Sequence, residues 1–505
     1  MPSTTSKREG DSMYDVIVVG TGFGGLTAGA VLAKKGYRVL TLEAANELGG
    51  SAGKFDRNGF RFAAGATVGM GFEQGGVFSK LFEELEVSPP TMSKLDPIMN
   101  VYLPDRDVTY YADQDKWYKE AGRVFGQGEN IQAFFNEVFS VADRLYPFID
   151  RKVVFPPATM GEWKNIVSSI NLHTLSVAPF VTQSVHDRLK KYDLHRNQPF
   201  LTFLNGQLMD SVQTTSEYSP SLLGYMALSV FHRGAFYVQG GLASIIDTLS
   251  DTLLHHGGEL KKRTRVDSIQ RKANSWEVKT KRRDTFDAKH LIVNAPLHNI
   301  FSLLSEEDAS SLPVKREKEE QQRSWGAFTL YIGADERFLD DSEANIPFHQ
   351  FIGDYEKPLS EGNQFLFSVS QPGDPLFAPP GKRAITLSTH TEPHQWWNRD
   401  QYESLKEQYV ERIVGQIEKK FPLFSDHIET LLPGTPVTFQ RFTQRRKGLV
   451  GGYAPTSKYS LLKAYSPNSR LDGLWFCGDT VFPGAGSLGS SLSGWTVASE
   501  IQKGR

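Results

Sequence analysis

Six residues near the start of the chain, Gly20 to Gly25 (GTGFGG), have the spacing of a phosphate-binding turn. In such a turn one glycine permits the tight bend, a second lets the backbone approach a pyrophosphate, and a third lets the next helix pack closely on a strand. The helix start adds free N–H groups and the positive end of the helix dipole, which favour bound phosphates. The motif predicts a nucleotide site that includes Gly20, Gly22, Phe23, Gly24 and Gly25.

The sequence on both sides of this turn supplies the elements that would position it. The apolar run 15–19 predicts a buried parallel strand, residues 26–35 predict a helix, and residues 38–42 predict a second strand that leads to Glu43. Glu43 lies 18 residues after Gly25, where a carboxylate can accept hydrogen bonds from the ribose hydroxyls of adenosine. It would repel a ribose 2′-phosphate, so the pattern favours NAD or FAD over NADP.

A second set of glycines, near the C-terminus, favours FAD over NAD. The apolar strand 474–477 delivers Gly478 and Asp479 to its carboxyl end, where ligands bind in open α/β sheets. An aspartate there can hold a hydroxyl of a sugar alcohol, and the glycines after it let the backbone run against a flat ring. A helix beginning near Leu488 would direct its N-terminus at that ring. The C-terminal segment adds Gly486, Ser487 and Leu488 to the predicted cofactor site. The segment after Glu43 adds Gly49, Gly50 and Ser51.

Residues 484–489 (GAGSLG) also have the spacing of a dinucleotide turn, but they cannot form a second site. Only 16 residues follow Gly489, too few for another strand with its acidic residue. We therefore expect one dinucleotide site, with electrons passing between FAD and a substrate, a quinone or oxygen.

With these motifs the chain resembles the carotenoid desaturase and isomerase family, a branch of the FAD-dependent amine oxidase superfamily. The resemblance rests on Glu43 with Gly49 and Gly50, on Gly478 with Asp479, and on segments 237–246, 256–269 and 290–296. It implies that Val266 contacts adenine through its backbone. It also implies an FAD-dependent oxidoreductase that desaturates a carotenoid or related isoprenoid by hydride transfer to flavin N5.

Three alternatives stay open on the sequence. Isomerisation of the polyene by reduced FAD is one, and GGSAG, with Ser51 where many desaturases carry Arg or Lys, is closer to the isomerases. A flavin amine oxidase is another, although the aromatic pair and the lysine usual near its flavin have no evident counterpart. A flavin-binding protein without activity is the third. No residue is assigned a catalytic role.

The motifs predict an α/β fold in which a Rossmann-like FAD-binding domain is assembled from discontinuous segments, beside an α+β substrate domain with a helical membrane-facing part. The predicted segments are 14–90, 234–302 and 435–505 for the first domain, 91–233 and 303–434 for the second, and 1–13 as a flexible lead. Within the substrate domain we expect strands at 327–332, 364–369 and 384–389 and helices at 131–149 and 400–420.

Composition excludes several classes of protein. Lys and Arg number 56 and Asp and Glu 58, a net charge of −2, which argues against a nucleic-acid partner bound by global positive charge. Cys477 is the single cysteine, and the histidines lack metal-ligand spacing, so we expect no disulfide and no metal. No window offers the ~18 apolar residues of a membrane span. We expect a cytoplasmic protein that contacts the membrane peripherally to reach an apolar substrate.

Overall fold

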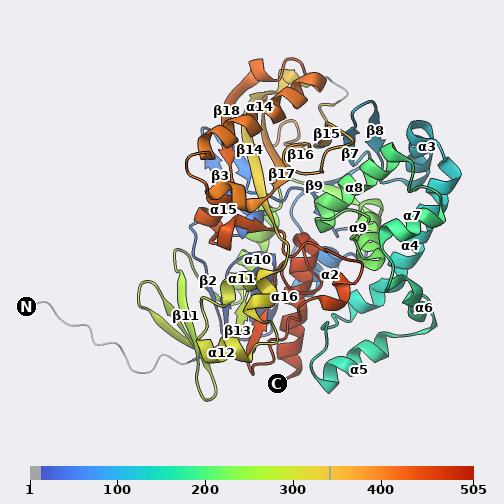
Figure 1. The fold of residues 1–505 in the computed structure, drawn as a ribbon. Helices are drawn as coiled ribbons and strands as arrows, with labels where there is room; N and C mark the ends of the chain where they lie inside the picture. The colour runs from blue at the N-terminus through green and yellow to red at the C-terminus, as the bar shows by residue number, and fades with distance from the viewer. Residues whose placement is uncertain (1–12, 340–342, 505) are drawn as a thin grey trace, which may run out of the picture.

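The structure is a computed structural model that describes residues 13–339 and 343–504 (Figure 1). The predicted flexible lead therefore lies outside the described residues, except for Met13. Two large sheets form the framework, and a group of helices flanks them on the right of Figure 1.

The first sheet is the predicted Rossmann-like sheet. It has seven strands in the order β10-β2-β1-β13-β12-β11, and β20 pairs with β13. The pairs among β10, β2, β1, β13 and β20 are parallel, and β11 and β12 extend the sheet in antiparallel fashion. The strands are β1 (Tyr14–Val19), β2 (Val39–Leu42), β10 (Glu259–Lys261), β11 (Val266–Arg271), β12 (Trp276–Thr280), β13 (Thr285–Val293) and β20 (Leu474–Phe476). Assembly from three distant stretches of chain confirms the predicted fold class.

Helix α1 (Phe23–Lys34) packs between this sheet and two other helices, α10 (Ala243–His255) and α16 (Gly486–Lys503). Every residue of α1 except Lys34 is buried. The approach of α16 is so close that a Cβ atom at Gly494 would lie 2.0 Å from the carbonyl oxygen of Gly24. The two glycine-rich motifs at opposite ends of the sequence are therefore in direct backbone contact.

The second sheet has eight strands in the order β18-β14-β17-β16-β15-β7-β8, and β19 pairs with β14. The strands are β7 (Met99–Tyr102), β8 (Asp107–Tyr110), β14 (Trp325–Asp335), β15 (Phe348–Ile352), β16 (Gln364–Val369), β17 (Lys382–Thr391), β18 (Ile428–Gly434) and β19 (Leu449–Val450). All three predicted strands are present, and α14 (Tyr402–Lys420) confirms the predicted helix. The domain boundaries stay a prediction, and β19 brings part of 435–505 into this second sheet.

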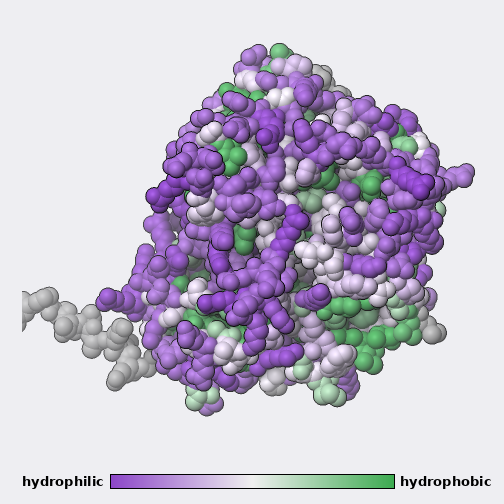
Figure 2. Space-filling model, in the orientation of Figure 1, coloured by the Kyte–Doolittle hydropathy of each residue, from purple (hydrophilic) through white to green (hydrophobic). Residues whose placement is uncertain are grey.

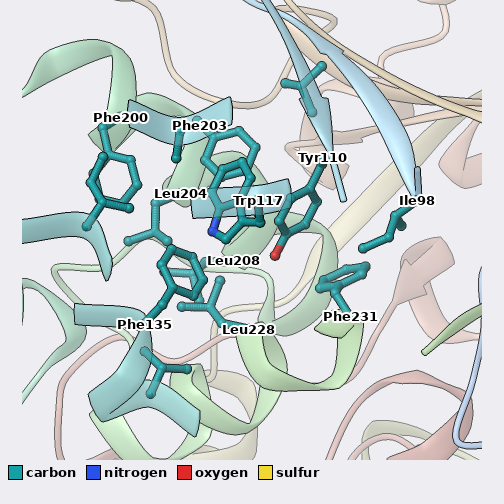
Figure 3. Packing of buried hydrophobic residues seen from close by; sticks show 14 of the residues in the cluster. Ile98, Tyr110, Trp117, Phe135, Phe200, Phe203, Leu204, Leu208, Leu228 and Phe231 are labelled. Carbon is teal, nitrogen blue, oxygen red and sulfur yellow. The ribbon is translucent and has the colours of Figure 1, made fainter. Parts of the chain in front are cut away.

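A group of helices gathers around an aromatic core (Figure 3). Trp117 stacks on Phe203 with ring centroids 5.1 Å apart, and Tyr110 contacts both rings edge-on. This core joins β7 and β8 to α3 (Gln114–Phe125), α4 (Gly128–Asp150), α8 (Gln198–Val212) and α9 (Ser221–Arg233). The predicted helix at 131–149 is α4. Two short helices, α5 (Met160–Ser169) and α6 (Leu172–Leu175), lie at the lower right of Figure 1.

The other described elements are short. Strands β3 (Lys54–Arg57) and β4 (Phe60–Ala63) form a two-stranded sheet, and β5 (Gly69–Met70), β9 (Ala235–Val238) and β6 (Met92–Leu95) form a three-stranded one. The further helices are α2 (Val77–Leu85), α7 (Val185–Lys191), α11 (Leu297–Ile300), α12 (Glu306–Ser311), α13 (Arg316–Glu320) and α15 (Pro436–Thr443).

Adjacent tryptophans provide a matched test of packing beside the second sheet. Trp396 is 1% exposed, stacks on Phe328 and donates its Nε1–H to Thr391 Oγ1 at 3.0 Å, whereas Trp397 is 39% exposed. We expect Trp396→Ala to lower the free energy of unfolding by about 3–5 kcal/mol. Trp397→Ala should cost less than about 1 kcal/mol. Denaturant titration of both variants checks this, and equal losses would contradict the packing described.

Candidate functional site

A cavity of about 1460 Å³ lies where the two sheets and the helical group meet. Its wall contains every residue predicted to bind the cofactor except Gly24 and Gly25: Gly20, Gly22, Phe23, Glu43, Gly49, Gly50, Ser51, Val266, Gly478, Asp479, Gly486, Ser487 and Leu488. The fold therefore brings together residues from the N-terminus, the middle and the C-terminus of the chain. Their contacts with a cofactor stay a prediction.

Four adjacent parallel strands end at this cavity, and three backbone hydrogen bonds link their ends. The N–H of Gly20 donates to Leu42 O (2.8 Å), that of Asn294 to Val19 O (2.9 Å), and that of Cys477 to Val293 O (3.1 Å). The carboxyl ends of β2, β1, β13 and β20 thus form one continuous edge. Ligands of open α/β sheets bind at such an edge.

Asn294, at the centre of this edge, is a residue that the sequence analysis did not assign to the site. Its side chain fills the space that three glycines leave open. A Cβ atom at Gly22 would lie 2.7 Å from Asn294 Nδ2, and one at Gly24 or Gly478 would lie 2.8 or 3.0 Å from Asn294 Oδ1. One signal was available in the sequence, because Asn294 directly follows an apolar strand in the same way as Gly20.

Gly24 and Gly25 face the protein rather than the cavity. A Cβ atom at Gly25 would lie 2.2 Å from the carbonyl oxygen of Gly20, and one at Gly24 would also approach Ser490 O at 2.9 Å. These glycines let α1 pack against β1 and α16, which is the role that the motif predicts for Gly25.

Glu43 is held at the cavity wall by its neighbours. Its carboxylate accepts hydrogen bonds from the N–H of Thr21 (2.9 Å), the N–H of Ala45 (2.8 Å) and the hydroxyl of Thr21. The Thr21 hydroxyl in turn accepts the N–H of Gly49 at 3.3 Å. This network fixes the orientation of Glu43 before any ribose is bound.

Features of the wall fit a bound FAD. Helices α1 and α16 both begin at the cavity, and neither has a side-chain cap or an acidic residue in its first turn. Their free N–H groups and positive dipole ends therefore suit an anionic ligand such as a pyrophosphate. In addition, the hydroxyl of Ser51 is buried without a hydrogen-bond partner at the same wall. A buried polar group without a partner is costly, and a bound cofactor would satisfy it.

Asp479 has a partner that the sequence analysis did not identify. Its Oδ2 accepts a hydrogen bond from Arg445 Nη2 at 2.6 Å, and Arg445 also donates through Nε to the carbonyl oxygen of Leu449. Arg445 is largely buried, and its neighbour Arg446 pairs with Glu320. Arg445 thus orients Asp479 at the cavity wall.

The rest of the cavity is mainly apolar, and its wall includes the titratable side chains of Asp210 and His390. Burial raises the pKa of Asp210 to about 6, although hydrogen bonds from Gln364 and Gln350 oppose the shift. Burial also lowers the pKa of His390 to about 4, so its imidazole is neutral at pH 7. Lys54 is the single lysine among the described lining residues, and it is paired with Asp247.

Two further buried side chains have structural roles. Cys477 is buried beside Asn294, and burial raises the pKa of its thiol. Trp495 is buried, and its Nε1–H donates to Glu84 Oε2 at 3.0 Å. Across residues 13–339 and 343–504, no cluster of three or more His, Cys, Asp or Glu could hold a metal ion. Within the same ranges, no helix is both long and apolar enough to cross a bilayer.

Gly25→Ala tests the backbone contact that shapes the site. The added methyl group would meet the Gly20 carbonyl, so we expect α1 to shift and the predicted flavin to be lost. Gly415→Ala in α14 is the matched control, because its Cβ atom would meet nothing within 4 Å. The ratio of absorbance at about 450 nm to that at 280 nm measures flavin content. Full flavin content in Gly25→Ala would contradict the role assigned to this contact.

Comparison with known proteins places this site in a family. A family model described as flavin containing amine oxidoreductase matches residues 23–502. Prolycopene isomerase 1 from an Oncidium hybrid cultivar is 28% identical over 513 residues, covering 99% of this chain and 85% of that protein. A 4,4'-diapophytoene desaturase from Methylomonas sp is 23% identical over 500 residues, covering 93% of this chain and 92% of that protein.

Solved structures share the fold. An oxidoreductase from Methanosarcina mazei has a TM-score of 0.62 and 16% identity, covering 96% of this chain and 99% of that one. The relatives confirm the resemblance stated from the motifs, and the solved structure confirms the fold class. The chain belongs to the flavin-containing amine oxidoreductase family and is an FAD-dependent oxidoreductase.

Proposed function

We propose that this enzyme acts on the carbon–carbon bonds of a carotenoid or a related isoprenoid polyene. The observation that carries the proposal is the cavity, whose apolar part is continuous with the predicted FAD-binding wall. Helix α9 contributes Leu222, Leu223, Met226, Ala227, Val230 and Phe231 to it, and α4 contributes Leu145, Tyr146, Phe148 and Ile149. Such a lining suits a long hydrocarbon, because it offers few polar partners and removes apolar surface from water.

The names of the relatives support the same substrate class, and they are consistent with two reactions, desaturation and isomerisation. FAD can accept a hydride at N5 from an activated C–H group, which gives desaturation, and in its reduced form it can support cis–trans isomerisation. The prolycopene isomerase at 28% identity favours isomerisation, and the Methylomonas desaturase favours the desaturation predicted from the sequence. In either reaction the cavity wall holds the polyene in place and excludes water. Desaturation would also need a final acceptor, for which we propose a quinone or oxygen.

An amine oxidase is less well supported by the cavity. The lysine often found near the flavin of amine oxidases would have to come from the cavity wall. Lys54 is the one described lysine there, and its side chain is engaged by Asp247.

Anaerobic incubation with polyenes tests the proposal and separates the two reactions. With reduced flavin and a poly-cis carotenoid, isomerisation gives all-trans product while the flavin stays reduced. With oxidised flavin and a partly saturated carotene, desaturation bleaches the flavin and lengthens the polyene chromophore. Absorption spectra and chromatography of the pigments measure both. Absence of both reactions would contradict the proposal, as would peroxide release with amines in a separate incubation in air.

We also propose that the enzyme docks on a membrane through α5, because its substrate class dissolves in lipid. Met160, Trp163 and Val167 of this helix are 85%, 53% and 61% exposed. Figure 2 shows a hydrophobic patch in green at the lower right, where Figure 1 places α5 and α6. Ile166 of α5 lines the cavity, so the patch adjoins the route to the site. An apolar surface beside a cavity is typical of an interaction site.

Charges around the patch favour an anionic lipid surface. Segment 151–180 contains one carboxylate, Glu162, which is buried and bonded to the backbone N–H of Thr159. Exposed basic side chains on the same segment are Arg151 and Lys164. Basic residues near an anionic bilayer each contribute about 1 kcal/mol.

The double variant Trp163→Ser with Val167→Ser tests this docking surface. We expect its affinity for phosphatidylglycerol vesicles to fall at least about tenfold, because two apolar side chains no longer enter the lipid. Leu254→Ser on α10, a residue 49% exposed elsewhere, should bind vesicles like the unchanged protein. Vesicle flotation measures both, and equal binding of the two variants would exclude α5 as the docking surface.

A further inference from the structure

A polar patch interrupts the apolar wall of the cavity at the C-terminal end of α8. Gln207, Asp210 and Gln213 of this region all line the cavity, as does His390 at the end of β17. Helix α8 is fixed in position because Phe200, Phe203, Leu204 and Leu208 are packed in the aromatic core (Figure 3). The orientation of the polar side chains is therefore set by the fold.

Asp210 is held by two glutamines of the second sheet. Gln350 Nε2 donates to Asp210 Oδ2 at 2.6 Å, and Gln364 Nε2 donates to Asp210 Oδ1 at 2.7 Å. Gln207 Nε2 donates in turn to Gln350 Oε1 at 2.9 Å. Each carboxylate oxygen thus receives one of these bonds and keeps capacity for another. Asp210 is only half-buried, and the surface it exposes faces the cavity.

His390 lines the same cavity as Asp210 and is connected to its neighbours in two ways. Leu366 of β16 pairs with Ser388 of β17, and the two strands are antiparallel. Gln364 lies two residues before Leu366 and His390 lies two residues after Ser388, so both lie on the same face at the same end of these strands. On the other side, the ring of Trp325 contacts His390 edge-on at 5.7 Å between centroids. The same Trp325 donates its Nε1–H to the carbonyl oxygen of Gln213 at 3.0 Å.

The patch has hydrogen-bonding capacity that the described residues do not use. Gln213 is 9% exposed, and its Oε1 is buried without a partner. The neutral imidazole of His390 offers one donor and one acceptor. A pure hydrocarbon lying against this patch would remove it from water and leave these groups unpaired, which disfavours binding. A hydroxyl group offers both a donor and an acceptor, which match the carboxylate oxygens of Asp210 and the imidazole of His390.

We propose that Asp210 and His390 form a recognition site for a hydroxyl group on the isoprenoid substrate. The proposal rests on the proposed function and narrows it, because the substrate is then an oxygenated polyene rather than a hydrocarbon. Sites built to bond a hydroxyl discriminate strongly against the analogue that lacks it, since the buried polar groups lose their partner. Asp210 and His390 are thus specificity residues and need no part in the redox step.

Equilibrium binding of matched polyenes to the holoenzyme tests this without turnover. Lycopene and rhodopin, its derivative with one terminal hydroxyl group, are titrated in the same detergent micelles, and quenching of tryptophan fluorescence reports binding. We expect rhodopin to bind at least about tenfold more tightly than lycopene. Equal affinities would overturn the proposal while leaving the proposed function intact. A preference for the aldehyde lycopenal over rhodopin would overturn the assignment of a hydroxyl.

Variants separate recognition from a structural role. Asp210→Leu and His390→Phe should each abolish the preference for rhodopin and leave lycopene binding unchanged or stronger. His390→Phe keeps a ring against Trp325, so it remains informative if Asp210→Leu fails to fold. Ser211→Ala is the matched control, because its hydroxyl already donates to Gln207 O at 2.8 Å. Equal weakening of both ligands would indicate a structural role and overturn the proposal. If neither polyene binds the unchanged enzyme, the proposed function fails and this inference fails with it.

Discussion

Backbone contact between the glycine turns and the ends of three strands is the constraint on which the rest of this structure depends. Gly22, Gly24 and Gly478 surround the side chain of Asn294, and a Cβ atom on any of them would lie no more than 3.0 Å from it. This contact joins segments that are hundreds of residues apart, and it fixes the starts of α1 and α16 at one cavity. Because interiors are close-packed, any displacement here would move the whole nucleotide wall.

The same cavity combines two physical environments. One part presents helix N-termini and the fixed carboxylate of Glu43, which suit a charged nucleotide. The other part is lined by apolar side chains of α4 and α9, which suit a hydrocarbon. FAD can serve both environments, because its phosphates are charged and its flat ring system has an apolar dimethylbenzene end. The function of such a fold depends on the residues that line the site rather than on the fold itself.

Access to such a cavity is a physical problem, because a polyene has almost no solubility in water. The exposed apolar side chains of α5 lie next to cavity-lining residues, and Phe155, in the segment that leads to α5, contacts Phe482 beside the C-terminal motif. A substrate entering here would pass from lipid to the flavin without crossing water. The polar patch around Asp210 would then provide substrate selectivity, since apolar contacts alone discriminate weakly between polyenes.

The sequence alone determined the local features of this protein. Strand and helix patterns around Gly20–Gly25 and Gly478–Asp479 predicted the nucleotide wall, because turns, apolar runs and helix starts depend on neighbours in the chain. The tertiary structure decided the pairs that come from distant segments. Examples are the packing of Asn294 against the glycines and the hydrogen bonds from Arg445 to Asp479 and from Gln364 to Asp210. Such pairs depend on strand order and register, which long-range packing sets and which no local pattern encodes.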